Sequence, residues 1–233
     1  MNERAGHTDL TPSSEDYLKA IYDLTATGGP AQTGGIAAAM QVAAPSVSGM
    51  VKRLTAAGLV SHVPYRGIQL TRVGRRAALQ VVRRHRIIET YLANKLGYGW
   101  DSVHEEAERL EHAVSEELIE RMAMALGNPQ YDPHGAPIPT RDGDVEDVSL
   151  VPLSEVPVGE TAELRMVSDR DPERLRYMAS LGLKLGTAFD VVGRQPFRGP
   201  VTIRLAGAVS RAQVVGYEMA QSVGCAVRMQ EVG

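Results

Sequence analysis

Sulfur and long apolar runs are both scarce in this sequence. Cys225 is the only cysteine among 233 residues, which excludes a disulfide framework and a thiolate cage for zinc and suits a reducing cytoplasm. No apolar run approaches the about 18 residues of a membrane-spanning helix. The opening residues, MNERAGHTDLTPSSED, also lack the apolar core of a secretory signal. We therefore expect a cytoplasmic protein without a membrane partner.

Acidic residues are missing from a long internal segment. Between Leu24 and Ile88 there is no Asp or Glu, although the net charge of the whole chain is −3. A basic segment without acids is the charge pattern expected of a surface that binds phosphates. The next segment is rich in acids, which indicates either a solvated face or a cation site. The basic residues are Lys52, Arg53, Arg66, Arg72, Arg75, Arg76, Arg83, Arg84 and Arg86, and the acids that follow are Asp101, Glu105, Glu106, Glu108, Glu111, Glu116, Glu117 and Glu120.

The first third of the chain has the element order of a winged helix-turn-helix. Ser13 or Ser14 is expected to cap a first helix, and Thr33 a short alanine-rich one. Pro45 then begins a helix that stops at Gly58, with a buried stripe of Val47, Met50, Val51 and Leu54. The runs LVSHV and GIQLT, joined by PYR, indicate a small hairpin. In such a unit the second helix of the pair enters the major groove.

The remainder divides into helices, a linker and strands. Helices are expected from Arg72 to about Leu96, over Ser102–Ala113 and over Ser115–Leu126, and their apolar stripes suit dimerisation. The Pro-, Gly- and Asp-rich stretch that follows is typical of a linker. Beyond it, TAELRMV, TAFDVVG, VTIRLA and CAVRMQEV indicate strands of a small barrel-like domain, interrupted by a helix over Asp171–Ser180.

The segment VHEEAERLEHAV carries the most specific pattern. His104, Glu108, Glu111 and His112 are spaced so that a helix would present them on one face, bordering an apolar stripe. His85 and Glu89 repeat the His–Glu spacing on the preceding helix. Nitrogen and oxygen donors without sulfur suit manganese, iron(II), cobalt or zinc.

A structural role is the alternative to a metal site. One such His–Glu pair would more often be a surface ion pair than a ligand set. Six such residues on two consecutive helices favour metal binding instead. His7, His62 and His134, which lie in the tail, the wing and the linker, receive no role.

These motifs together resemble the diphtheria-toxin-repressor family, which includes manganese-transport and iron-dependent regulators. The resemblance covers nearly the whole chain through SEDYLKAIYDL, the helix-turn-helix with its wing, RRHRIIETYL, HEEAERLEHAVSEEL and DPHGAPIP, in the family's order. It implies an α+β protein made of a winged helix-turn-helix, a helical metal-binding and dimerisation domain, and an SH3-like β-barrel. The expected boundaries are 1–73, 74–128, a linker over 129–150, and 151–233.

The resemblance also assigns metal ligands. A principal site is matched by Asp16, Glu108, Glu111 and His112, and a second site by His85, Glu89 and His104. Iron-sensing relatives tend to have Met and Cys where Asp16 and Glu108 stand, so oxygen donors here favour Mn²⁺, with Fe²⁺ as the alternative. Lys19 departs from manganese-type relatives that carry a second acid there. Asp171 and Glu173 are the candidates for ligands from the last domain.

On DNA, the resemblance implies that Pro45, Ser46 and Gly49 approach the bases while Lys52, Arg53 and Arg66 serve phosphates. Gly49 has no side chain to bond a base, so shape and apolar contacts would contribute to recognition.

The function predicted from all this is a metal-dependent transcriptional regulator, a repressor that binds a palindromic double-stranded DNA operator as a homodimer. It would not be an enzyme. Two rivals remain: a winged-helix regulator that senses an organic ligand, and a metal-dependent hydrolase. A hydrolase would leave the basic wing unexplained, and the sequence has neither a nucleophile motif nor a phosphate-binding glycine loop.

Overall fold

The computed structural model describes residues 10–26, 28–63, 66–168, 170–206 and 212–228, and divides into two compact units. The first unit holds residues 1–85, 111–113 and 139–145, and the second holds 86–110, 114–138 and 146–233. Within the described ranges no single helix is both long and apolar enough to cross a membrane; only the pair of helices over Thr33–Met40 and Ala44–Ala56, bent by 107°, meets that test jointly.

The first unit contains three helices before its hairpin: α1 (Pro12–Thr25), α2 (Thr33–Met40) and α3 (Ala44–Ala56). Two predicted caps are wrong. Thr11, not Ser13 or Ser14, precedes α1, and its side chain accepts a hydrogen bond from the backbone N–H of Ser14. The helix begins this early because proline is favoured in the first helical turn, where Pro12 lies. Gln32, not Thr33, is the residue before α2, and its side chain makes no capping bond. The buried stripe predicted for α3 is confirmed.

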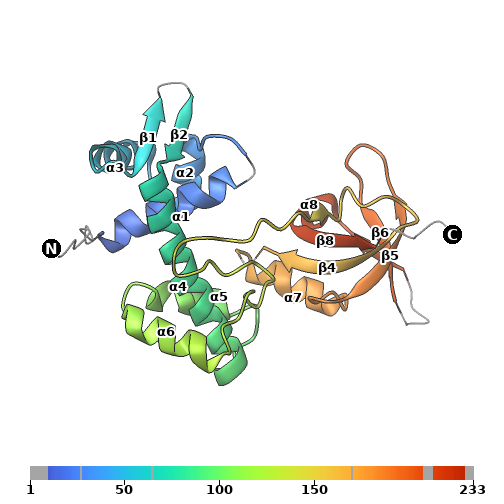
Figure 1. Ribbon diagram of the computed structural model, residues 1–233. Coiled ribbons are helices and arrows are strands. Elements are labelled where there is room, and N and C mark those ends of the chain that lie inside the picture. The colour runs from blue at the N-terminus through green and yellow to red at the C-terminus, as the bar shows by residue number, and fades with distance from the viewer. Residues whose placement is uncertain (1–9, 27, 64–65, 169, 207–211, 229–233) are drawn as a thin grey trace. The chain divides into compact units, whose positions relative to one another are not determined.

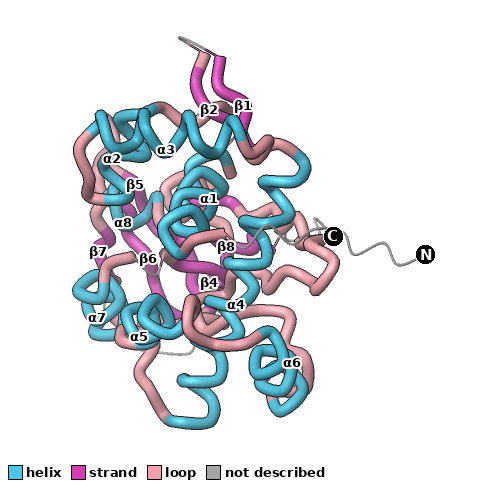
Figure 2. Tube along the Cα trace, turned by 90° about the vertical axis from the view of Figure 1, so that its left-hand side faces the viewer, coloured by secondary structure: helices cyan, strands magenta, loops and turns pink. Residues whose placement is uncertain are grey.

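A two-stranded wing follows α3 (Figures 1 and 2). Strands β1 (Val60–Val63) and β2 (Gly67–Leu70) pair antiparallel, as predicted. The turn residues Pro64 and Tyr65 lie outside the described residues, as do the tail before Leu10 and the end of the last predicted strand beyond Arg228. Helix α4 (Arg72–Leu96) starts directly against the wing: a Cβ on Gly74 would lie 1.8 Å from the carbonyl oxygen of Leu59. Backbone therefore packs on backbone there.

Helix α4 has the predicted bounds, but the helix after it is shorter than predicted. The helices α5 (Val103–Leu110) and α6 (Glu116–Ala125) pack with the second half of α4 around Ile87, Leu92, Val103, Ala107 and Ile119. Ser115 caps α6 by accepting a hydrogen bond from the backbone of Leu118. Residues 111–114 form a turn rather than the end of α5, so Glu111 and His112 are not on the same regular helix as His104 and Glu108. The expectation of four donors on one helix face is wrong for this reason.

The rest of the second unit is built on a six-stranded antiparallel sheet in the order β3-β8-β4-β5-β6-β7, which packs around one core. Phe189, Leu164, Ile203 and Val215 lie in that core. Together with the winged helix and the helical layer, this barrel confirms the predicted α+β fold class. The elements are β3 (Val151–Pro152), β4 (Thr161–Val167), α7 (Pro172–Ser180), β5 (Ala188–Arg194), β6 (Val201–Leu205), β7 (Gln213–Val215), α8 (Tyr217–Gln221) and β8 (Val223–Arg228).

Residues 129–150 have irregular backbone, as their composition predicts, but parts of the stretch are buried. Asp132 is 6% exposed and His134 1%. The His134 carbonyl accepts a hydrogen bond from the backbone of Val167 at 2.9 Å. Gly135, with φ +86°, leaves no room for a Cβ, which would lie 1.9 Å from the carbonyl oxygen of Arg165. The part of the stretch around His134 and Gly135 is therefore packed onto β4 within the second unit.

Candidate metal centre and nucleic-acid interface

Glu111 and His112 lie in the turn after α5, and that turn groups with α1 and the first half of α4 in the N-terminal unit. The Nε2 atom of His112 lies 2.6 Å from Oδ1 of Asp16 and 3.5 Å from Oε1 of Glu111. Ligand atoms of all three residues lie within 4.8 Å of one another. The side chain of Glu111 is fully buried, whereas that of Asp16 is 35% exposed. The three donors therefore converge at a place that solvent reaches from one side.

These three donors fit a divalent metal ion of intermediate hardness. Two carboxylates and one imidazole supply oxygen and nitrogen donors and no sulfur, and this donor set suits Mn²⁺ and Fe²⁺. The two negative charges of the carboxylates also balance the charge of a divalent cation. The residues present thus fit such an ion by type, distance and access.

Glu15 holds the imidazole of His112 in place. The Nδ1 atom of His112 donates to Oε2 of Glu15 at 2.8 Å, and Nη2 of Arg84 lies 2.6 Å from the other oxygen of that carboxylate. Burial alone would lower the pKa of His112, but its hydrogen bonds with Glu15 and Asp16 raise it above the usual value. A carboxylate on Nδ1 leaves Nε2 directed at Asp16, the orientation that a metal-ligating histidine needs.

Lys19 and His85 surround the buried carboxylate of Glu111. Nζ of Lys19 lies 3.1 and 2.9 Å from the two oxygens of Glu111 and 3.1 Å from Nδ1 of His85. The same His85 nitrogen is 2.5 Å from Oε2 of Glu111. Burial would raise the pKa of Glu111, but the hydrogen bond from His85 and the charge of Lys19 lower it below its ordinary value. Glu111 is therefore ionised in this arrangement.

A second group of donors lies in the second unit. Nδ1 of His104 is 3.3 Å from Oε1 of the fully buried Glu89, and Nε2 of His104 is 3.8 Å from Oε1 of Glu108. The Glu108 side chain is 45% exposed. Glu89, His104 and Glu108 thus form one chain of contacts from the interior to the surface.

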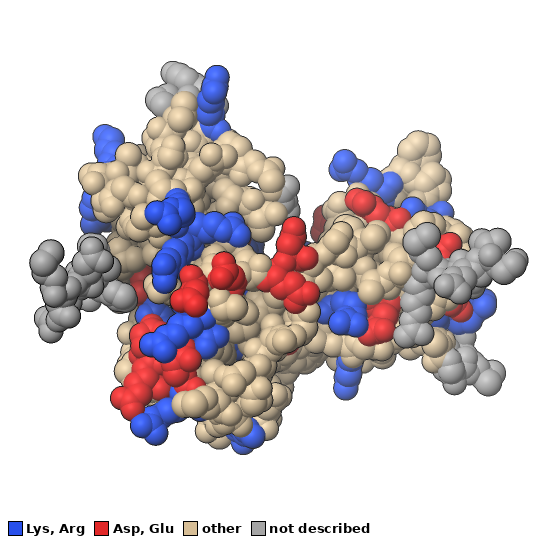
Figure 3. Space-filling view, in the orientation of Figure 1, with Lys and Arg blue, Asp and Glu red and all other residues tan. Residues whose placement is uncertain are grey.

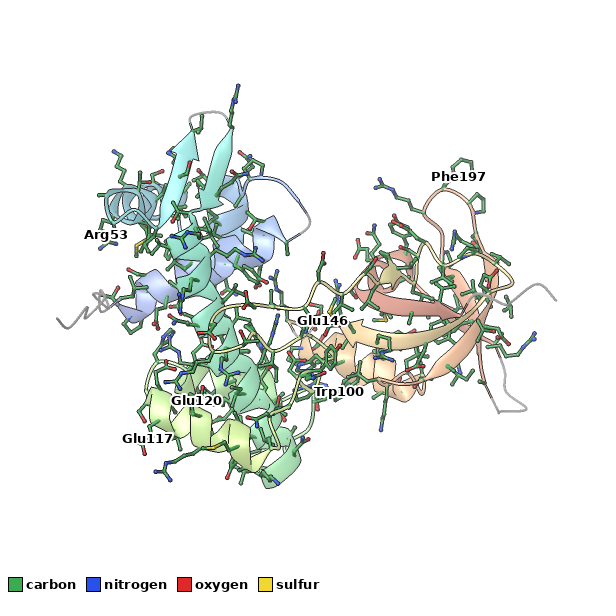
Figure 4. All side chains as sticks on the ribbon, in the orientation of Figure 1. Arg53, Trp100, Glu117, Glu120, Glu146 and Phe197 are labelled. Carbon is green, nitrogen blue, oxygen red and sulfur yellow. The ribbon has the colours of Figure 1, made fainter. Side chains whose placement is uncertain are left out.

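The interior end of that chain continues to residues that received no role from the sequence. Nδ1 of His134 lies 3.8 Å from Oε2 of Glu89, and its Nε2 donates to the carbonyl of Trp100 at 2.6 Å. Asp132 is 3.4 Å from Nε of Arg86. Burial, then the charge of Glu89, raises the pKa of Asp132 to about 6, and Arg86 opposes the rise. Figure 4 shows Trp100, beside this group, where the helices and the barrel of the second unit meet.

Within the first unit, three residues of the predicted principal site, Asp16, Glu111 and His112, come together, and His85 contacts Glu111. Within the second unit, His104 contacts both Glu89 and Glu108. Asp171, a predicted candidate ligand, is the N-cap of α7: its side chain accepts hydrogen bonds from the backbone N–H groups of Glu173 and Arg174.

Sequence reasoning missed Glu15 and Arg84, which hold His112, and the buried Asp132–His134 pair. Glu15 could have been found from its place beside Asp16; the others had no local signal.

The exposed face of α3 carries the residues predicted to meet DNA. Pro45, Ser46, Gly49, Lys52 and Arg53 are all exposed. A Cβ on Gly49 would meet no heavy atom within 4 Å, so this helix leaves open space there. Figure 4 shows Arg53 directed outward from α3, and Figure 3 shows Lys and Arg side chains on the visible face of the winged-helix unit. Arg66, in the wing, is also exposed.

Three family profiles match consecutive parts of the chain. They are the iron dependent repressor N-terminal DNA binding domain over residues 9–68, the iron dependent repressor metal binding and dimerisation domain over 71–140, and the FeoA domain over 151–227. Together they follow the order of elements described above.

Curated relatives and solved structures agree with these profiles. The chain is 33% identical to the diphtheria toxin repressor of Corynebacterium efficiens over 197 residues, which covers 80% of this chain and 86% of the relative. It is 37% identical to the iron-dependent repressor IdeR of Mycobacterium leprae over 65% of this chain and 69% of that one. A structure described as a manganese-dependent transcriptional repressor complex with manganese is 41% identical, with a TM-score of 0.84, over 91% of this chain and 98% of that chain. The manganese regulator SloR is 35% identical, with a TM-score of 0.79, over 94% and 100%.

Proposed function

Since the chain belongs to the diphtheria-toxin-repressor family of metal-dependent transcriptional regulators, we propose that it is a manganese-dependent repressor that binds a palindromic operator as a homodimer. The observation that carries the proposal is the convergence of Asp16, Glu111 and His112 between the first helix of the DNA-binding unit and the turn after α5. The proposed division is DNA binding by residues 1–73, metal binding and dimerisation by 74–128, a connection over 129–150 and the SH3-like domain over 151–233.

Manganese is the proposed metal because the donors are oxygen and nitrogen. Asp16 and Glu111 provide hard carboxylate oxygens, and His112 adds one imidazole. The relative with 41% identity is described as a complex with manganese, which supports the choice. Iron(II) is the second candidate, because relatives such as the Mycobacterium leprae protein are described as iron-dependent. As the resemblance implies, Glu108 is proposed as a further ligand of this site, and His85, Glu89 and His104 are proposed to serve a second site.

The bound ion would act as a cross-link. Asp16 belongs to α1, which packs against the helix-turn-helix, whereas Glu111 and His112 belong to the turn that joins α5 to α6. A metal held by all three would fix α1 relative to that turn. If the operator-binding arrangement has the higher metal affinity, metal and DNA binding favour each other through a coupling free energy.

Two surfaces of the chain are proposed to bind its partners, DNA and a second subunit. On α3, Lys52 and Arg53 would contact phosphates while Pro45, Ser46 and Gly49 approach the bases, with Arg66 of the wing beside the backbone. For the second subunit, Leu96, Leu118 and Met124 offer exposed apolar side chains on the helices that match the dimerisation profile, and Met124 is 62% exposed. A two-fold dimer would present two α3 helices to an inverted repeat.

The proposed role requires no catalysis, because the donor set would hold an ion rather than activate a nucleophile. Its place would be the cytoplasm, where a bacterial chromosome lies.

Operator binding measured with added Mn²⁺ and with excess chelator tests the proposal. We expect Mn²⁺ to strengthen binding to an inverted repeat, with footprints on both half-sites. Lys52→Ala should weaken binding to all sequences and reduce the slope of log affinity against log salt by about one, as expected for one lost phosphate contact. Lys184→Ala, an exposed change in the barrel, is the control. Metal-independent binding, or a single half-site bound by a monomer, would contradict the proposal.

A further inference from the structure

Lys19 places a positive charge inside the group of proposed ligands. Its Nζ donates to both carboxylate oxygens of Glu111, at 3.1 and 2.9 Å, and lies 3.1 Å from Nδ1 of His85. The Lys19 side chain is 15% exposed and that of Glu111 is fully buried. Lys19 follows Asp16 by three residues on α1, so both side chains face the same side of that helix.

An ammonium group in this position uses the same electron pairs as a metal ion. A carboxylate oxygen directed at Nζ cannot at the same time direct that lone pair at a cation. A metal close to Glu111 would also meet the repulsion of the lysine charge at short range, where water screens it poorly. Lys19 and a metal ion therefore compete for Glu111.

We propose that Lys19 is a tethered cation that occupies the Glu111 side of the metal site when no metal is bound, so that an incoming divalent ion must displace it. Lys19 would stabilise the ion-free protein, because it supplies a positive charge and two hydrogen bonds to a fully buried carboxylate. It would also weaken metal affinity, and so raise the metal concentration at which the regulator responds. This inference rests on the proposed metal site and concerns how that site is tuned.

The test compares three full-length variants with the parent. Lys19→Gln removes the charge but keeps a polar side chain, Lys19→Arg keeps the charge, and Lys184→Gln makes the same charge change at an exposed position in the barrel. Mn²⁺ affinity is measured by calorimetric titration, and the unfolding temperature is measured in excess chelator. The rate at which chelator removes Mn²⁺ is measured from the loaded protein, so it can be read even if a variant unfolds without metal.

For Lys19→Gln we expect Mn²⁺ to bind at least about tenfold more tightly and to leave more slowly, while the unfolding temperature in chelator falls. Lys19→Arg and Lys184→Gln should stay close to the parent in affinity. A lower unfolding temperature with unchanged or faster metal loss would show a purely structural lysine and overturn the proposal. Equal tightening in Lys184→Gln would reduce the effect to net charge and overturn it too. If the parent itself binds no Mn²⁺, the proposed function fails; if the parent binds and Lys19→Gln binds alike, only the lysine proposal fails.

Discussion

Two clusters in this protein are built from the same residue types and differ in burial. In the first unit, Asp16, Glu111 and His112 meet at a site whose Asp16 side chain is 35% exposed. In the second unit, Glu89 and His134 meet Asp132 with exposed fractions of 0%, 1% and 6%. Two carboxylates and one imidazole thus occur twice, once beside solvent and once within the interior.

The partners of each cluster show why burial matters. In the open cluster, Nε2 of His112 is directed at Asp16, and the outer contacts to Glu15 only hold the ring. In the closed cluster, Asp132 accepts hydrogen bonds from the backbones of His134 and Ala136, and His134 donates to the carbonyl of Trp100. Asp132 and His134 thus bond backbone groups of the interior, whereas the open groups, which solvent reaches from one side, are the ones proposed to hold an ion. A list of residue types would not separate the two.

Replacing the open imidazole should have the largest functional effect. His112→Ala removes one donor and is expected to weaken Mn²⁺-dependent operator binding by about 100-fold, the upper part of the usual coupling between sites. The unfolding free energy in chelator should fall by only about 1 kcal/mol, since the pairs of this partly exposed imidazole with Glu15 and Asp16 are lost but no buried apolar side chain is removed. Operator titration and denaturant unfolding check both. Normal Mn²⁺-dependent operator binding by this variant would contradict the proposal that the open cluster, unlike the buried one, holds the metal ion.

Replacing the closed imidazole should do the reverse. His134→Ala leaves a cavity and a carbonyl of Trp100 without its donor, so we expect a loss of about 2–4 kcal/mol in unfolding free energy. At a temperature where the variant is folded, its response to Mn²⁺ should match that of the parent. Denaturant unfolding and operator titration give the two values. A His134→Ala protein of normal stability that no longer responds to Mn²⁺ would place His134 among the ligands.

A smaller effect is expected where a residue acts through His112. Glu15→Gln keeps an oxygen near Nδ1 but removes the charge that holds the ring and pairs with Arg84. Mn²⁺ affinity should fall by about tenfold, the scale of changes behind a ligand, and calorimetric titration measures it. Glu105→Gln, at an exposed position on α5, is the control. Unchanged affinity in Glu15→Gln would mean that the ring is held by packing alone.

The fold was largely predictable because its signals are local. The stripe of apolar residues predicted the buried face of α3, and short β-rich runs bounded by turn residues predicted β1, β2 and β4, because each of these signals lies within a few neighbouring residues. The cap of α1 was placed wrongly because Pro12 can begin a helix and so moves its start toward Thr11. For α2, the residue before the helix is Gln32, which makes no capping bond. Such choices between adjacent polar residues differ by little free energy.

The spacing of His104, Glu108, Glu111 and His112 indicated donors, but it did not show where the helix that carries them would end. Because α5 ends at Leu110, Glu111 and His112 lie in the turn after it rather than on its regular face. Contacts between residues far apart in sequence, such as Lys19 with Glu111 or His134 with Glu89, depend on tertiary packing. No pattern of spacing contains them.

The contact between Gly74 and the carbonyl of Leu59 also restricts how this sequence can vary. Any other residue at position 74 would place a Cβ where a backbone oxygen already lies. Side-chain rearrangement cannot relieve that clash, so the backbone of α4 or of the start of the wing would have to move. Neighbouring surface positions of α4 can accept many residues, but this one admits only the smallest. In a library of random substitutions with selection for a folded protein, position 74 should therefore remain glycine while Arg75 and Arg76 beside it vary.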